Sequence, residues 1–156
     1  MSSEPPDSSP VVVAVSDEQA MGVDMERIVG VARRTAESEG ARGEISITLV
    51  DASRMAGLNG QHMGKPRPTD VLSFPIDGLA SADASLDEGP PWLIGEVVLC
   101  PEVAADQAQG PVEEELDLLV AHGVLHLLGY DHDTESGAEQ MRAREFRLTG
   151  RAGAQA

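Results

Sequence analysis

Three of the four histidines in this chain lie within the segment HGVLHLLGYDH, which runs from His122 to His132. His122 and His126 are four residues apart in a segment with helical periodicity, so their imidazoles share one helix face with Cβ atoms about 5–6 Å apart. Gly129 can adopt the left-handed conformation that ends helices, which allows the chain to bring His132 back to the same place. Burying three imidazoles without partners would be costly, and three neutral imidazoles suit zinc. We predict that His122, His126 and His132 hold one Zn²⁺ ion, although nickel or another divalent ion also suits imidazole ligands.

Three protein ligands leave the fourth tetrahedral position open, as in catalytic zinc sites. Zinc lowers the pKa of a bound water towards about 7 and polarises carbonyl or phosphoryl oxygens, so hydrolysis is the expected reaction class. The histidine spacing matches the metzincin protease pattern HExxHxxGxxH, but Gly123 stands where that pattern has its glutamate general base. Losing this base costs peptide hydrolysis a factor of about 10²–10⁴ in rate. The residues therefore favour a phosphodiester substrate, with a zincin-like metalloprotease as the alternative.

Apolar periodicity predicts the elements that must position these histidines. The helix that carries His122 and His126 is apolar nearly all round, so we expect it to be central and buried. The expected architecture is a single-domain α/β fold with about four strands covered by about five helices. The predicted strands span residues 11–15, 44–51, 71–74 and 92–100, and the predicted helices span 24–39, 52–61, 101–110, 112–128 and 134–149.

Length and composition predict one domain over residues 11–150, between a disordered N-terminal tail (1–10) and a short C-terminal tail (151–156). The acidic, aperiodic stretch 77–91 is expected to be a mobile loop. No segment is long enough to span a membrane. The single cysteine, Cys100, cannot form an internal disulfide, which fits a reducing cytoplasm, and we expect it to be a buried strand residue. We expect a cytoplasmic protein that binds neither a membrane nor a nucleotide cofactor.

The net charge of −16 argues against general affinity for nucleic acid, which is usually met by a basic surface. The eleven Lys and Arg residues are unevenly spread, however, and could form a local basic rim. The alternative for the C-terminal group is a solvated helix face stabilised by the helix dipole. The two clusters are Arg54, Lys65 and Arg67 in the middle of the chain, and Arg142, Arg144, Arg147 and Arg151 near its end.

Three separated segments together resemble the YbeY family of metal-dependent endoribonucleases that mature ribosomal RNA. HGVLHLLGYDH is similar to the family hallmark, and PTDVLSFP from Pro68 to Pro75 is similar to a second motif. LIGEVVL from Leu93 to Leu99 resembles a third motif, with Glu96 in place of aspartate. The resemblance covers roughly residues 11–149, and Asn59 also falls where the family has it.

This resemblance implies a single-domain α/β fold and zinc held by the three histidines. It also implies cleavage of single-stranded RNA, in maturation of the 3′ end of small-subunit ribosomal RNA and in ribosome quality control. The expected partners are ribosomal RNA and the small ribosomal subunit or its assembly factors. A further alternative is a non-catalytic assembly factor in which the metal only holds the last helix to the core.

One position departs from the family pattern. Counted between Asn59 and Pro68, the family's frequent aromatic-arginine pair falls on His62 and Met63, so the arginine expected to assist catalysis is absent. Either Lys65 or Arg67 takes over the phosphate contact, or the arginine is dispensable in this branch.

The remaining polar residues near the motifs leave the general acid and base unassigned. Asp131 or Asp133 could orient an imidazole, and Tyr130 either donates to substrate or packs. Asp70 is expected to be structural, through bonds to nearby backbone N–H groups.

Overall fold

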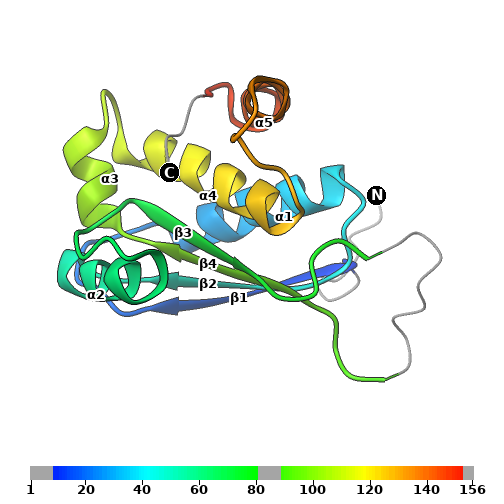
Figure 1. The fold of residues 1–156 in the computed structure, drawn as a ribbon, viewed down its shortest axis with the longest axis horizontal. Helices are drawn as coiled ribbons and strands as arrows, with labels where there is room; N and C mark the ends of the chain where they lie inside the picture. Colours follow the sequence, from blue (N-terminus) through cyan, green and yellow to red (C-terminus); the bar gives the residue numbers. More distant parts are fainter. Residues whose placement is uncertain (1–8, 81–88, 153–156) are drawn as a thin grey trace.

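Four strands form one mixed sheet in the order β1-β2-β4-β3 (Figure 1). In this computed structural model, residues 9–80 and 89–152 are described. Strands β1, β2 and β4 are parallel to one another, and the edge strand β3 is antiparallel to β4. The strands are β1 (Val11–Asp17), β2 (Gly43–Leu49), β3 (Val71–Pro75) and β4 (Leu93–Leu99).

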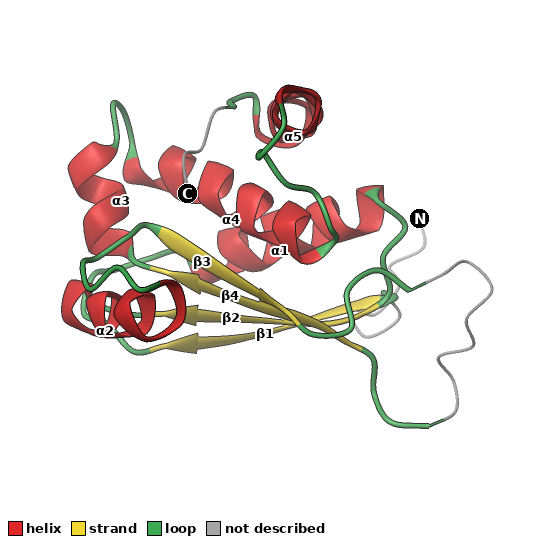
Figure 2. Cartoon of the chain, viewed as in Figure 1, coloured by secondary structure: helices red, strands yellow, loops and turns green. Residues whose placement is uncertain are grey.

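Helices cover both faces of the sheet, which gives the layered arrangement in Figure 2. Helices α1 and α4 pack on one face, and α5 packs against α4. Helix α2 contributes to a smaller apolar cluster on the opposite face, where Met55 packs with Val98 and Cys100. The helices are α1 (Met25–Ser38), α2 (Ala52–Met63), α3 (Pro101–Gln107), α4 (Val112–Leu127) and α5 (Glu135–Thr149).

Side-chain alternation along the strands separates the two apolar clusters. Ile45, Ile47 and Leu49 of β2 are fully buried in the large cluster beneath α1 and α4, while the intervening Ser46 and Thr48 are half-buried on the other face. In the central strand β4, Val97 and Val98 are both buried because helices cover both faces there. The core therefore lies mainly between the sheet and α4.

Sequence signals account for the helix boundaries. The side chains of Asp24, Asp51 and Thr134 accept hydrogen bonds from backbone N–H groups in the first turns of α1, α2 and α5. Gly64 ends α2 with φ of 70°, in the left-handed conformation. Helix α4 begins with three glutamates that suit the positive end of its dipole.

The predicted α/β fold with four strands and five helices is confirmed, with differences at element ends. Helix α2 continues two residues beyond the predicted end, to Met63. Helix α3 ends at Gln107 rather than near Gly110. Strand β3 includes Pro75, which an edge strand tolerates because its missing N–H is not needed by a neighbour.

Cys100 is fully buried, as predicted, but β4 ends at Leu99, so the cysteine lies just after the strand, at the N-cap of α3, rather than within it. It packs in the α2 cluster, and burial raises the pKa of its thiol above the usual value. Since the thiolate is the reactive form, this cysteine is a packing residue rather than a nucleophile.

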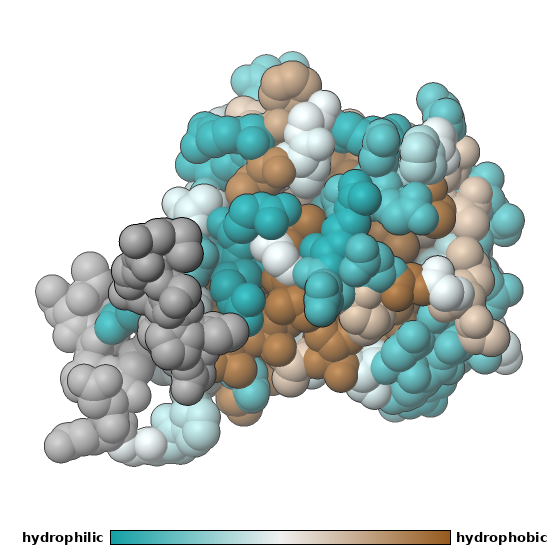
Figure 3. Space-filling model, turned by 180° about the vertical axis from the view of Figure 1, so that it is seen from behind, coloured by the Kyte–Doolittle hydropathy of each residue, from teal (hydrophilic) through white to brown (hydrophobic). Residues whose placement is uncertain are grey.

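Parts of the predicted tails and acidic loop lie outside the described residues, namely 1–8, 81–88 and 153–156. Next to them, the carbonyl of Pro10 accepts from the N–H of Gly43 at 2.8 Å, and the indole of Trp92 donates to the carbonyl of Gly78 at 2.8 Å. Among the described helices, none is both long and apolar enough to cross a membrane. Figure 3 shows polar side chains over much of one face, with apolar residues reaching the surface between them.

Candidate metal centre

The structure brings the three predicted histidines together at the C-terminal end of α4. His122 and His126 come from successive turns of the helix, and His132 comes from the loop that follows. Ligand atoms of the three side chains all lie within 4.8 Å of one another, and such a group could hold a metal ion. His122 is buried, His126 is half-buried and His132 is exposed, so the cluster opens from the core towards solvent.

Gly129 makes the turn that returns His132 to the helix. Its φ is 101°, in the left-handed region that favours glycine. The N–H of Gly129 bonds to the carbonyl of His126 at 3.1 Å, and the N–H of Tyr130 bonds to that of Leu125 at 3.1 Å. These bonds satisfy carbonyls at the helix end and direct the following loop back across it.

Hydrogen bonds determine which nitrogen of two rings faces the centre of the cluster. Nδ1 of His122 lies 2.7 Å from a carboxylate oxygen of Glu145, and Nδ1 of His126 lies 2.9 Å from the carbonyl oxygen of Tyr130. Both partners are acceptors, so both Nδ1 atoms donate, and in neutral imidazoles Nε2 then carries the lone pair.

The two Nε2 atoms lie only 3.1 Å apart. Two lone pairs at this distance repel unless a proton or a cation lies between them. With zinc–nitrogen bonds of about 2.0–2.1 Å, a tetrahedral ion holds two ligand nitrogens about 3.3 Å apart. The donor set and its spacing therefore fit a divalent cation.

Glu145 is the partner of His122 that the sequence did not reveal. Both side chains are only 1% exposed. Asp131 and Asp133 were the candidates for this role, but Asp131 accepts from the backbone N–H of Asp133 at 2.6 Å, within the loop. Glu145 lies thirteen residues beyond the last histidine, and only the packing of α5 on α4 brings it close. Its one sequence signal is its place four residues after the buried Met141, on the inner face of α5.

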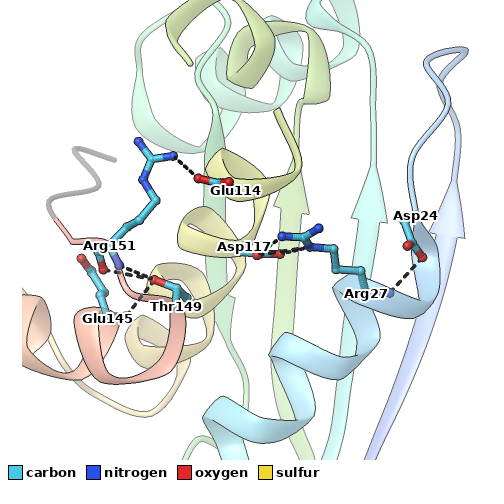
Figure 4. Close-up of polar contacts among 7 residues, drawn as sticks. All are labelled: Asp24, Arg27, Glu114, Asp117, Glu145, Thr149 and Arg151. Atoms are coloured by element: carbon cyan, nitrogen blue, oxygen red, sulfur yellow. Dashed lines mark hydrogen bonds and ion pairs between the residues drawn. The ribbon is translucent and has the colours of Figure 1, made fainter. Parts of the chain in front are cut away.

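Contacts at the C-terminal end of α5 hold Glu145 against α4. The hydroxyl of Thr149 donates to the carbonyl of Glu145 at 2.8 Å, and Arg151 forms an ion pair with Glu114 of α4 at 3.6 Å. Figure 4 shows these contacts beside the bidentate pair of Arg27 and Asp117, which joins α1 to the same helix. Helix α4 is thus tied to both neighbouring helices.

A pocket of about 410 Å³ opens next to the histidines. One wall is the edge strand β3, and the other is the end of α4 with its following loop. Its lining residues are mainly apolar, apart from the histidines and Asp131. They are Met63, Val71, Leu72, Ser73, Phe74, Pro75, His126, Gly129, Tyr130, Asp131 and His132.

Gly123, in place of the protease glutamate, packs directly against the sheet. A Cβ added there would lie 2.9 Å from Val97 and 3.3 Å from both Ser73 and Val71. The hydroxyl of Ser73 also donates to the carbonyl of Gly123 at 3.0 Å. This position therefore has no room for a glutamate side chain.

The positions that replace the family's aromatic-arginine pair lie at the end of α2. Met63 is exposed and lines the histidine pocket, while the ring of His62 contacts that of Phe74 with centroids 4.9 Å apart. Lys65 and Arg67 are exposed on the loop before β3 and are not among the residues that line the pocket. Asn59 holds this loop, since its side-chain amide donates to the carbonyl of Arg67 at 2.9 Å.

The hydroxyl of Tyr130 donates to Glu39 at 2.5 Å. The guanidinium of Arg144 lies over the Tyr130 ring, 4.6 Å from its centroid, and pairs with Glu39 at 3.2 Å. Burial, and then the bond to Glu39, raises the pKa of the Tyr130 phenol above its usual value. Arg144 and Arg151 of the C-terminal basic cluster are thus engaged in ion pairs with carboxylates.

Asp70 is buried at the start of β3 and has a structural place, although not through the predicted backbone N–H bonds. Its carboxylate accepts from the side-chain amide of Gln107 at 2.6 Å, and its carbonyl accepts from the N–H of Cys100 at 2.9 Å. Asp70 therefore joins β3 to α3 and the end of β4.

Comparisons with known proteins agree with this arrangement. Residues 13–153 match the family model described as "Endoribonuclease YbeY". A protein of that name from Salinispora tropica is 41% identical over 150 residues, which cover 87% of this chain and 92% of that protein. One from Streptomyces coelicolor is 43% identical over 136 residues, covering 83% and 82%.

A solved structure also resembles the fold. The solution structure of TM1509 from Thermotoga maritima aligns with a TM-score of 0.57 and 25% identity, over 89% of this chain and 90% of that one. With the match to the family model over nearly all of the described residues, this chain belongs to the family of the endoribonuclease YbeY.

Proposed function

We propose that this protein is a zinc-dependent endoribonuclease that cleaves single-stranded RNA in maturation of the 3′ end of small-subunit ribosomal RNA and in ribosome quality control. Family membership supports a hydrolase that acts on RNA. The observation that carries metal dependence is the 3.1 Å approach of the two Nε2 atoms whose rings donate through Nδ1 elsewhere. The small ribosomal subunit or its assembly factors are the proposed partners, and the cytoplasm is the proposed compartment.

In this proposal His122, His126 and His132 hold the ion, and hydrogen bonds at Nδ1 orient the rings of His122 and His126. Glu145 keeps the Nδ1–H tautomer of His122, and the carbonyl of Tyr130 does the same for His126. A bound divalent cation would supply charge neutralisation at phosphoryl oxygens and activation of a water nucleophile at neutral pH.

The chain's other residues would bind and orient the RNA. The apolar wall formed by Phe74 and Met63 restricts water on one side of the pocket. Lys65 or Arg67, on the exposed loop next to Met63, is proposed to contact a phosphate in place of the absent arginine. The loop is held by Asn59 but leaves both side chains at the surface.

Two observations favour catalysis of RNA cleavage over the alternatives. A metalloprotease needs a base beside the metal, and the packing of Gly123 against Val97 excludes a glutamate there. A purely structural metal is usually enclosed by four protein ligands. Within residues 9–80 and 89–152, the group that could hold a metal consists of three histidines rather than four ligands. Two of them, His126 and His132, line a pocket.

The test is cleavage of a ribosomal RNA fragment by zinc-loaded protein, compared with His126→Ala purified in the same way. We expect the wild type to cut single-stranded regions and the variant to lose both bound metal, measured by elemental analysis, and cleavage. Equal cleavage by the two proteins would identify a contaminating nuclease and overturn the assignment. Reconstitution with zinc or nickel in parallel, followed by the same assay, decides which ion supports activity.

A further inference from the structure

A second pocket of about 370 Å³ lies on the opposite face of the sheet, beside α2. Its lining combines apolar side chains with polar and charged groups. The lining residues are Glu18, Thr48, Val50, Arg54, Leu58, His62, Phe74, Glu96 and Val98. Its volume lies in the range of about 300–1,000 Å³ that is typical of small-molecule sites.

This second pocket adjoins the histidine pocket across the edge strand. Phe74 of β3 lines both pockets. The last two residues of α2 lie on either side of this boundary, because His62 lines the second pocket and Met63 lines the histidine pocket. A flexible polymer that occupied the histidine pocket would therefore reach the second pocket by passing over the edge of β3.

The side chains of the second pocket present a stacking surface and hydrogen-bond acceptors. The rings of His62 and Phe74 meet edge to face, with an interplanar angle of 62°. Glu96 lies on the floor, where it accepts from the hydroxyl of Thr48 at 2.8 Å, and a carboxylate has lone pairs for further donors. Arg54 is exposed near the N-terminal end of α2.

Two carboxylates in one small pocket disfavour a phosphate as its occupant. They suit a flat group that carries N–H donors, such as a nucleobase with an exocyclic amino group. Proteins bind single-stranded nucleic acid by stacking bases on aromatic rings, reading base edges with polar side chains and meeting the backbone with cations. In this pocket the stacking rings would be those of Phe74 and His62. The polar side chains for the base edge would be Glu96 and Glu18. The cation for the backbone would be Arg54.

We propose that this pocket is a nucleobase subsite that accepts cytosine, adenine or guanine in preference to uracil, from the RNA strand whose neighbouring segment occupies the histidine pocket. The proposal rests on the RNA substrate of the proposed function. Uracil has no exocyclic amino group, and its one ring donor, N3–H, lies between two carbonyl oxygens that the carboxylate of Glu96 would repel. Arg54 then meets the phosphate that links this nucleotide to the next.

Methyl NMR of the full-length, zinc-loaded protein tests the proposal, with cytidine and uridine as probes. Nucleosides contain no phosphodiester bond and so cannot be cleaved. We expect cytidine to shift the methyl signals of Leu58, Val50 and Val98, and to bind at least about tenfold more tightly than uridine, as expected for a hydrogen bond to a charged acceptor.

Glu96→Gln is the informative variant, because it keeps the size of the side chain and an oxygen for Thr48 but removes the charge. We expect it to reduce the preference for cytidine over uridine to less than about twofold. Glu26→Gln, an exposed change on α1, is the matched control and should keep the preference. Equal binding of the two nucleosides to the wild type, or shifts confined to Val71 and Met63 in the histidine pocket, would overturn the proposal.

The outcomes also separate this subsite from the proposed function. If the protein cleaves RNA but cytidine leaves Leu58 unshifted, the subsite is wrong and the nuclease assignment stands. If cytidine binds selectively but no RNA is cut, the subsite stands and the nuclease assignment falls.

Discussion

At the scale of single residues, the buried contact between Glu145 and His122 supports the proposed metal centre. The carboxylate fixes the ring so that Nε2 faces the other histidines. A carboxylate behind a ligand histidine also strengthens the bond of that histidine to a metal. Glu145 contacts Nδ1 of His122, on the side of the ring away from Nε2, so it acts by positioning a proposed ligand.

Replacing Glu145 with Gln should weaken zinc binding by about 10–100-fold, the usual effect of losing a partner behind a metal ligand. The amide is nearly isosteric, so the fold should persist. Competition with a chromogenic chelator measures the affinity directly. Glu135→Gln, an exposed change on the same helix, is the control, and a wild-type affinity in both variants would remove Glu145 from the centre.

Gly123 shows how one missing side chain constrains both packing and chemistry. The helix surface at this position meets Val97, Val71 and Ser73 within 3.3 Å of where a Cβ would lie. A glycine at this position thus accounts for two features. It lets α4 approach the sheet closely, and it leaves the site without a protease-type base.

Gly123→Ala should lower the free energy of unfolding by up to about 2 kcal/mol. Overpacking costs about 1–3 kcal/mol, and this exceeds the gain of about 1 kcal/mol from better helix propensity. Gly57→Ala, inside α2 with nothing within 4 Å of the added carbon, should instead stabilise the protein by about 0.5–1 kcal/mol. Urea unfolding measures both, and a stabilised Gly123→Ala variant would contradict the packing argument.

At the scale of elements, the junction between α2 and β3 forms part of both pockets. Asn59 is buried in α2 and its side chain holds the carbonyl of Arg67, while its own carbonyl accepts from the N–H of Lys65 at 3.3 Å. Hydrogen bonds to Asn59 of α2 therefore hold the loop that carries Lys65 and Arg67 and leads to β3.

Asn59→Ala should destabilise the protein by about 0.5–1.5 kcal/mol, because it removes the part-buried hydrogen bond to the carbonyl of Arg67. It should also raise the KM for RNA, since the loop carrying Lys65 and Arg67 loses its fixed position. Chemical denaturation and steady-state cleavage measure the two effects. Gln61→Ala, an exposed change on the same helix, should alter neither, and an Asn59→Ala variant with wild-type stability would rule out the anchoring role.

At the scale of the whole molecule, strong negative charge is combined with an RNA substrate. The net charge is −16, so long-range electrostatics oppose binding to a polyanion. Favourable contacts must then come from a few local cations, stacking and the metal centre rather than from a general basic surface.

RNA affinity should accordingly be weak and fall steeply as salt rises, because the few phosphate contacts release counterions. Fluorescence anisotropy with a labelled oligoribonucleotide at several salt concentrations measures the slope. A substitution of Arg67 by Ala should make the slope shallower by about one unit if Arg67 contacts a phosphate. Nanomolar affinity that persists at high salt would contradict the charge argument.

The sequence by itself determined the fold class, nearly all of the elements and the three histidines. These depend on local periodicity, on capping residues such as Asp51 and Thr134, and on motif spacing along a single helix. The left-handed turn at Gly129 belongs to the same local information, since its conformation follows from the residue type.

Tertiary structure alone decided the contacts between elements distant in the sequence. Glu145 meets His122 because α5 packs on α4, and the second pocket exists because β2, β4 and β3 place Thr48, Glu96 and Phe74 on one face. Strand order and helix packing arise from the summed burial of many side chains, so no local pattern specifies which distant carboxylate will support a ligand. The histidines were therefore predictable as a group, whereas the residue that orients His122 was not.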